Sequence, residues 1–283
     1  FMIGIFWGAY AEGFPAVAWG SVVGLFVSTI AGYWLGLDDE NGAQGLWGFN
    51  GVLVGCAFPT FLGNTVWMWV ALIICSALTT WVRTAFNRLL APTGVSSFTF
   101  PFVFCTWMFL LASRLTPAMP DTYMSHPVLA TVVDPSVSSS FGDVVIYWLK
   151  GIAQVFLINN WVTGIFFLAA LAVSSWRAAA WAAIGSAIAL ALAYIYKVPG
   201  ADLAEGLYGF SAVLTAIALG ATFCTPTLKN AVWAVLGTAV TFFIQAGMNA
   251  LFAPLGLATL TGPFCVATWL FLIPGYKFFT AKN

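Results

Sequence analysis

The segment FTFPFVFCTW (residues 98–107) returns near the far end of the chain as LTGPFCVATW (residues 260–269). Both copies place a threonine two residues before a proline, inside a strongly apolar run. The offset between the copies is constant at 162 residues. The identical residues are Thr99, Pro101, Phe102, Thr106 and Trp107, matched by Thr261, Pro263, Phe264, Thr268 and Trp269. An internal repeat of this kind decides the organisation of the whole chain.

The repeat extends well beyond this motif. GLWGFNGVLVG (45–55) matches GLYGFSAVLTA (206–216) at an offset of 161, so one residue is inserted between the two matched blocks. We therefore expect a first repeat at 1–113, a polar connection at 114–148 and a second repeat at 149–283. The second copy starts earlier, because residues 149–167 have no counterpart before Phe1. Either the first copy lacks this element, or the sequence starts inside it; the second explanation is favoured, because an apolar residue such as Phe1 is an unusual first residue.

Composition predicts a membrane protein. Hydrophobic residues make up 61% of the 283 residues and charged residues only 6%, against about 25% charged in ordinary soluble domains. The apolar runs have helical length and lack the alternation of a transmembrane barrel, so an all-α integral membrane protein is expected. The formal net charge is zero, which leaves no basic face for nucleic acid. The five cysteines lie in apolar segments and indicate packing rather than metal ligation.

The apolar runs predict about five spans in each repeat. They fall at 1–10, 15–35, 46–60, 64–88 and 98–113, and again at 160–175, 178–196, 207–222, 229–250 and 262–276. The amphipathic segment 144–157 has about half the length of a span and predicts a re-entrant half-helix. Because five is an odd number, the second repeat should insert upside down, which predicts two inverted repeats.

Basic residues predict the orientation. If the helices alternate in direction, one side holds six of them and the other holds three, together with an acidic connection. The first group is Arg83, Arg88, Arg177, Lys229, Lys277 and Lys282, and the second is Arg114, Lys150 and Lys197. The positive-inside rule then places the connection outside the cell.

Several kinds of chemistry are missing from the sequence. The single histidine, His126, lies in the polar connection, and no Walker motif is present. The acidic residues fall in expected loops, so no apolar span carries a central charge. The loop residues include Asp38, Asp39, Glu40, Asp202 and Glu205. We therefore expect no catalytic residues, no metal and no cofactor. An enzyme or an ion-coupled transporter is disfavoured, and passive passage of a neutral solute is favoured.

The polar groups that remain are Thr99 and Thr261, with Gln154 in the half-length segment. Proline has no N–H group. If Pro101 and Pro263 lay within a helix, the carbonyls four residues earlier, those of Ser97 and Thr259, would therefore have no donor. Alternatively, each motif begins a helix, with threonine as N-cap and proline in the first turn. Either version gathers polar groups in apolar surroundings.

Inversion would bring the two threonine motifs face to face. Phe49 and Phe210, with Leu53 and Leu214 one helical turn further on, are matched apolar pairs that either pack in the core or wall a narrow slot. An uncharged slot lined by acceptors suits a small, planar, neutral molecule with many N–H donors, such as urea.

With these motifs, the sequence resembles the urea transporter (urea channel) family over nearly its whole length. The resemblance rests on GLWGFNGVLVG and GLYGFSAVL, on the two T-x-P-F motifs and on AQVFLINNWVTGIFF (153–167). It implies two inverted five-span halves, each with a re-entrant half-helix, a homotrimer in the lipid bilayer with one urea pore per subunit, and a location in a bacterial inner membrane. A channel for ammonia or short amides, and an ion-coupled secondary transporter, are the alternatives.

The resemblance also assigns site residues. It makes Thr99 and Thr261 central pore residues and places Phe49 and Phe210 in aromatic slots. Leu53 and Leu214 narrow the middle of the pore, and Gln154 and Val155 line one entrance. Leu157 stands where an aromatic residue would complete a slot, so that end is expected to be looser.

Overall fold

The computed structural model describes residues 1–131 and 133–275, and within them the regular structure is helical. The all-α prediction is therefore confirmed for this part of the chain. Lys277 and Lys282, which contributed to the predicted orientation, lie outside the described residues. The predicted helices agree with the observed ones to within a few residues at most ends.

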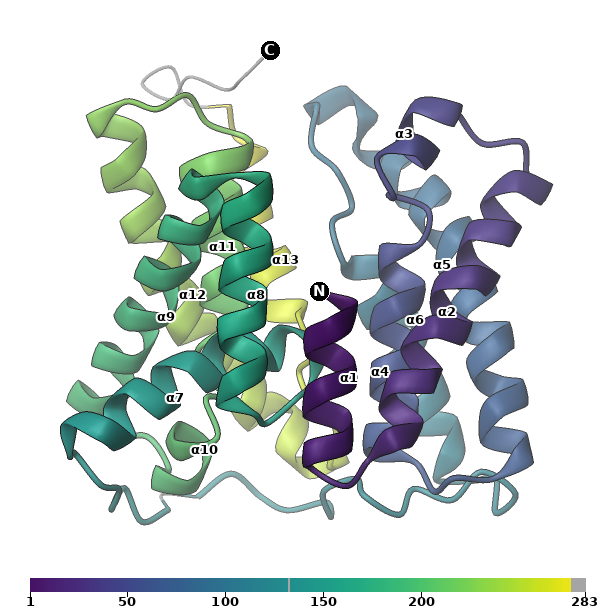
Figure 1. Cartoon of the computed structure of the whole chain (residues 1–283), viewed down its shortest axis with the longest axis horizontal. Coiled ribbons are helices and arrows are strands. Elements are labelled where there is room, and N and C mark those ends of the chain that lie inside the picture. The colour runs from purple at the N-terminus through teal and green to yellow at the C-terminus, as the bar shows by residue number, and fades with distance from the viewer. Residues whose placement is uncertain (132, 276–283) are drawn as a thin grey trace.

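The helices of the two halves follow in the same order, with additional elements in the second half (Figure 1). The first half contains α1 (Met2–Ala11), α2 (Pro15–Trp34), α3 (Asp39–Ala43), α4 (Phe49–Phe61), α5 (Val66–Leu90), the 3-10 turn η1 (Ala91–Thr93) and α6 (Phe100–Ser113). The second half contains α7 (Phe141–Ala153), η2 (Gln154–Phe156), α8 (Trp161–Ser174), α9 (Trp176–Ile195), α10 (Gly200–Ala204), α11 (Phe210–Ile217), the π-turn η3 (Ala218–Thr222), α12 (Leu228–Phe252), η4 (Ala253–Leu255) and α13 (Gly262–Leu272). The order matches from α1 in the first half and α8 in the second, and the second half adds α7, η2 and η3. Equivalent long helices have equal lengths: α2 and α9 have 20 residues each, and α5 and α12 have 25.

Local sequence explains where the long helices begin. Thr65 and Thr227 are the N-caps of α5 and α12, and their hydroxyls accept the backbone N–H groups of Met68 at 3.1 Å and Asn230 at 3.2 Å. Such caps satisfy N–H groups that the first turn of a helix leaves without partners. The same cap at the same repeat position indicates that both copies start this helix by the same means.

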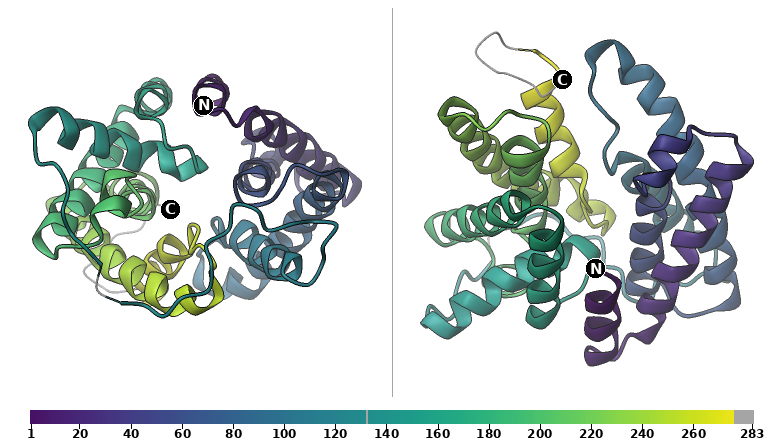
Figure 2. Two further views of the ribbon diagram at one scale, coloured as in Figure 1. Left: turned by 90° about the horizontal axis from the view of Figure 1, so that it is seen from below. Right: turned by 45° about the horizontal axis from the view of Figure 1, so that its top comes forward.

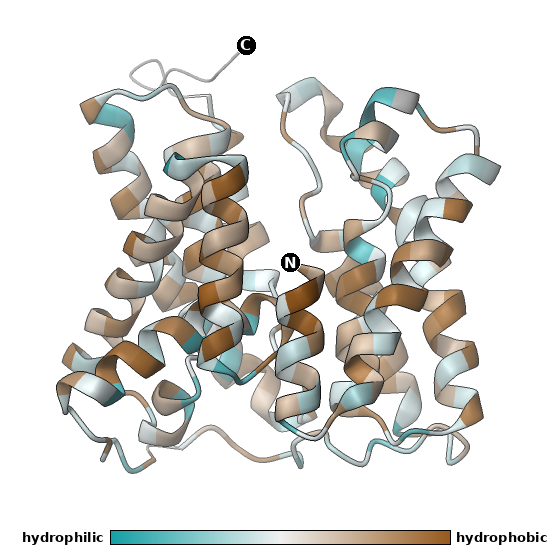
Figure 3. Cartoon of the chain, in the orientation of Figure 1, coloured by the Kyte–Doolittle hydropathy of each residue, from teal (hydrophilic) through white to brown (hydrophobic). Residues whose placement is uncertain are grey.

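By length and hydropathy, four helices of the described chain can cross a membrane. A fifth span results if α7 with η2 and α8, which meet at a bend of 71°, are counted together. The other expected spans are apolar helices of only 10–17 residues: α1, α4, α6, the α11–η3 segment and α13. Apolar residues occupy the middle of the helices and polar residues gather at their ends and in the connection (Figure 3). This is the pattern of a protein solvated by lipid.

In the first half, glycines bring α2 and α4 into close contact. A Cβ atom added to Gly51 would lie 2.2 Å from the carbonyl oxygen of Gly24, and one added to Gly55 would lie 2.0 Å from that of Gly20. Gly51 and Gly55 thus present a face of small residues to α2. Small residues let helix backbones approach where lipid supplies no hydrophobic driving force.

In the second half, the equivalent crossing of α9 and α11 is filled differently. Trp181 occupies the position of Gly20, and its indole packs on Gly220, where an added Cβ would lie 2.2 Å from the ring. Position 220 corresponds to Pro59 in the first half. Both halves therefore have the crossing, but the larger residue is Pro59 of α4 in the first half and Trp181 of α9 in the second.

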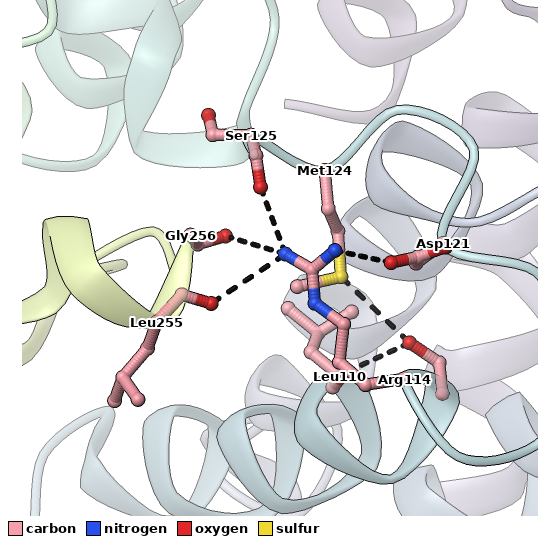
Figure 4. A network of polar contacts seen from close by, with 8 residues as sticks. Leu110, Arg114, Asp121, Met124, Ser125, Leu255 and Gly256 are labelled. Carbon is pink, nitrogen blue, oxygen red and sulfur yellow. Dashed lines mark hydrogen bonds and ion pairs between the residues drawn. The ribbon is translucent and has the colours of Figure 1, made fainter. Parts of the chain in front are cut away.

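The polar connection is fastened to the second half by Arg114 (Figure 4). Its guanidinium pairs with Asp121 and donates to the backbone carbonyl oxygens of Ser125 at 2.8 Å and Gly256 at 3.3 Å. Nearby, the Val128 N–H donates to the Ala253 carbonyl at 3.0 Å. These contacts hold the first part of the connection against the η4 turn.

Candidate functional site

The two T-x-P-F motifs start helices. Thr99 and Thr261 are the N-cap residues of α6 and α13, with Pro101 and Pro263 in the first turn, as the second of the two predicted versions has it. This position costs proline nothing, because the first turn of a helix has no partner for its N–H groups.

The prediction that the carbonyls before the prolines lose their donors is wrong. The Ser97 carbonyl accepts the Phe100 N–H at 3.0 Å, and the Thr259 carbonyl accepts the Gly262 N–H at 3.1 Å. Both carbonyls find a donor three residues later because the chain makes a turn there instead of continuing a helix.

This turn places a large residue in an unusual conformation in both copies. Phe98 has a backbone φ of 51° and Leu260 one of 50°, values that residues other than glycine rarely adopt. In the first copy the Phe102 N–H, which in a regular helix would bond to the Phe98 carbonyl, donates instead to Asn50 Oδ1 at 3.1 Å. Backbone strain of this kind collects at functional sites, and here it immediately precedes each threonine.

The two threonine hydroxyls meet in the interior. Thr99 Oγ1 and Thr261 Oγ1 are 2.6 Å apart, and the residues are 8% and 2% exposed. Neither hydroxyl caps its own helix. An ordinary intrahelical threonine behaves differently: the Thr238 hydroxyl donates to the Ala234 carbonyl one turn earlier, at 2.7 Å. The predicted face-to-face arrangement of the motifs is therefore observed.

The tryptophans of the motifs exchange reciprocal bonds around this pair. Trp107 Nε1 donates to the Ala258 carbonyl at 2.9 Å, and Trp269 Nε1 donates to the Ser96 carbonyl at 3.0 Å. Ala258 and Ser96 are equivalent positions of the repeat. Equivalent residues of the two halves therefore bond across to each other on both sides of the threonine pair.

A cavity of about 190 Å³, here called the apolar cavity, lies on one side of this pair. Among the described residues that line it, Thr99 contributes the hydroxyl and the others are hydrophobic: Phe1, Phe49, Leu53, Ile152, Val155, Phe156, Phe167, Leu171, Val213, Leu214 and Ile217. The rings of Phe156 and Phe167 stand edge to face, with centroids 5.0 Å apart. The lining offers no charge to an ion.

A second cavity of about 470 Å³, here called the polar cavity, is lined by Gln154, Leu157, Phe210, Asp202, Glu205, Gln245 and fourteen further residues. Gln154 is buried, and its Nε2 donates to the Glu205 carbonyl at 3.0 Å. Gln154 and the next residue, Val155, line different cavities, as do Phe210 and Leu214, one turn apart in α11. The η2 turn and α11 therefore run from one cavity to the other.

The structure divides the predicted site residues between the two cavities. Thr99, Phe49, Leu53, Leu214 and Val155 line the apolar cavity. Gln154, Leu157 and Phe210 line the polar cavity, together with Leu260, the residue that precedes Thr261. Phe49 and Phe210 are thus not part of one slot.

Sequence reasoning missed two neighbours of the site. Phe156 lines the apolar cavity from within the η2 turn; its place between Gln154 and Leu157 could have suggested this. Cys265 Sγ lies 3.3 Å from Thr99 Oγ1. A thiol in an apolar run gave no signal, because buried cysteine usually serves as a small packing residue.

The charged groups stand outside this centre. Arg83 is buried near the end of α5 and donates to Asn41 Oδ1 at 3.3 Å. Asp202 lies in the short helix α10, where burial, followed by the charge of Glu205, raises the pKa of its carboxyl. In the described part of the chain no group of three or more His, Cys, Asp or Glu side chains could hold a metal ion.

A helical protein of this hydropathy, with a buried uncharged hydroxyl pair beside two cavities, is a membrane transporter or channel for a small solute. A sequence profile of the family described as "Urea transporter" matches residues 1–276, and the chain belongs to this family. It is 31% identical over 280 residues to "Urea transporter 1" of Ovis aries, with 95% of this chain and 70% of that protein covered. The Capra hircus protein of the same name matches equally well, and that of Mus musculus is 29% identical over 264 residues. Family membership makes the chain a transporter and not an enzyme.

Proposed function

We propose that this chain conducts urea across the membrane by facilitated diffusion, along a passage from the polar cavity past Thr99 and Thr261 to the apolar cavity. The observation that carries the proposal is the buried hydroxyl pair, with Thr99 on one cavity and the neighbour of Thr261 on the other. Family membership supplies the solute.

Urea is planar and neutral and carries four N–H donors, so it needs acceptors without charge. Each threonine oxygen has two acceptor lone pairs, and the pair at 2.6 Å uses few of them. A urea molecule between the two threonines exchanges their mutual bond for bonds to itself, which keeps the number of hydrogen bonds while the solute passes. An ion is excluded, because the lining of the apolar cavity cannot replace the interactions that the ion makes with its hydration water.

The proposal includes inversion of the two repeats. It is supported by the meeting of the N-terminal ends of α6 and α13 at the threonines and by the reciprocal tryptophan bonds. A two-fold axis lying in the membrane plane would produce both features. The homotrimeric assembly rests on the family resemblance.

Urea flux into proteoliposomes tests the proposal. We expect urea to enter faster than into protein-free vesicles, with an initial rate that a proton gradient leaves unchanged. Entry no faster than into empty vesicles would refute urea conduction, and accumulation against a urea gradient would indicate an ion-coupled mechanism.

Removal of one central hydroxyl tests the route. Thr99→Val keeps the shape of the side chain and removes one hydrogen-bonding group, so we expect urea flux to fall about tenfold. Thr261→Val should behave in the same way. Thr238→Val is the matched control, because its hydroxyl bonds within its own helix and its loss should leave the flux within about twofold of the parent. Normal flux in both Thr99→Val and Thr261→Val would place the route elsewhere.

A further inference from the structure

Two carboxylates of the short helix α10 and the residue after it form an acidic wall of the polar cavity. Asp202 and Glu205 both line this cavity. The equivalent residues of the first half, Asn41 and Gln44, are neutral. The acidic pair is therefore not required by the fold that both halves share.

Among the described residues that line the polar cavity there is no lysine or arginine. The causes that raise the pKa of Asp202 are burial and the charge of Glu205, and both disfavour its anion. The guanidinium of Arg114, which donates to the lining residues Ser125 and Gly256, is already paired with Asp121. The cavity is consequently a region of negative potential beside a neutral passage.

Gln245 supplies a second, independent polar group in the lining of the same cavity. Gln245 lines the polar cavity, is 2% exposed, and its Oε1 has no hydrogen-bond partner among the described residues. Its amide orientation is fixed from the other end, because Nε2 donates to Thr259 Oγ1 at 2.6 Å and to Asn249 Oδ1 at 2.8 Å. A buried acceptor without a donor is costly unless a ligand or water supplies one.

We propose that the polar cavity binds a small planar cation rich in N–H donors, of the guanidinium class, through Asp202, Glu205 and Gln245. Carboxylates bind guanidinium groups by paired, charge-assisted hydrogen bonds, and the Gln245 oxygen accepts a further N–H. The cation obstructs the entry of urea past Gln154. It does not pass further, because the apolar cavity offers it no counter-charge.

The binding part of this inference stands independently of urea conduction, whereas the obstruction rests on the proposed function. Two measurements separate them. Isothermal titration of guanidinium chloride into the purified protein measures binding alone. Urea flux into proteoliposomes with added guanidinium measures obstruction.

Both measurements are made in the same buffer. We expect guanidinium to bind and to inhibit urea flux, and the double variant D202N/E205Q to raise the half-inhibitory concentration at least about tenfold. Inhibition is expressed relative to the uninhibited flux of each protein. Asp143→Asn is the matched control, because this half-buried carboxylate lies in the first turn of α7, away from the cavity lining, and accepts hydrogen bonds from Ser138 and Ser140.

Tetramethylammonium chloride at the same concentration controls for charge screening, since this cation has no N–H donors. Equal inhibition by both cations, or equal inhibition of the parent and the double variant, would overturn the obstruction. An absence of binding heat and of inhibition in the parent protein would overturn the site itself, even if the double variant does not fold. Binding without any urea flux in the parent would retain the site and refute the proposed function.

Discussion

The crossing of α2 with α4 and the crossing of α9 with α11 occupy equivalent places in the two halves, but they are packed in opposite ways. In the first half, Gly20 is small and Pro59 fills the space beside it. In the second half, the large side chain is Trp181 and the small partner is Gly220. The views of Figure 2 show the two halves facing each other around the middle of the molecule. The repeat therefore preserves which helices cross, while the helix that carries the large residue at the crossing differs between the halves.

The largest effect is expected when a methyl group is added where α2 and α4 meet at glycines. Gly55→Ala places a Cβ atom 2.0 Å from the backbone carbonyl of Gly20, where neither helix can yield without moving. We expect destabilisation of about 3 kcal/mol or more, seen as loss of monodisperse protein on size-exclusion chromatography.

Two controls belong to this experiment. Ala216→Gly, the reverse change at the equivalent position of α11, should cost only about 1 kcal/mol. Gly247→Ala in α12 adds a Cβ atom in open space and should be tolerated. Normal yield of Gly55→Ala would show that the close approach is not required.

A smaller effect is expected at the second crossing, because there the obstacle is a side chain. Gly220→Ala places a Cβ atom 2.2 Å from the Trp181 indole, and we expect a loss of about 2 kcal/mol. Combined with Trp181→Ala, the loss should be smaller than the sum of the two single losses by about 1–2 kcal/mol. Thermal unfolding of the two single variants and the double variant in detergent measures this coupling, and additive losses would contradict it.

The smallest effect is expected at Asn50 and at its equivalent in the second half, Ser211. Asn50 accepts the Phe102 N–H, whereas the equivalent Ser211 has a hydroxyl without a partner among the described residues. Asn50→Ser should therefore leave a buried N–H unsatisfied and cost about 1 kcal/mol. Ser211→Ala should be nearly neutral by thermal unfolding. A larger loss for Ser211→Ala than for Asn50→Ser would reverse the assigned roles.

Much of the fold and the centre of the site followed from the repeat. The matched Thr99 and Thr261 motifs, taken with an odd number of spans, predicted their meeting without any knowledge of side-chain geometry. The carbonyl prediction was wrong because Phe98 and Leu260 adopt positive φ values, which sequence suggests only for glycine, asparagine or aspartate. The acidic wall was invisible because Asp202 and Glu205 were correctly expected outside the spans, and only the fold shows that they line a cavity.

The Arg114 contacts divide the connection into two parts with different properties. Its first part, from Asp121 to Val128, is bonded to the second half and contributes Ser125, His126 and Val128 to the polar cavity. Leu129 and Ala130, which follow, are exposed. The chain is bonded to the second half again at Asp134 and Ser138. An epitope tag or fluorescent label inserted after Ala130 would therefore fall between two anchored stretches, whereas the same insertion a few residues earlier would disrupt the lining of the polar cavity.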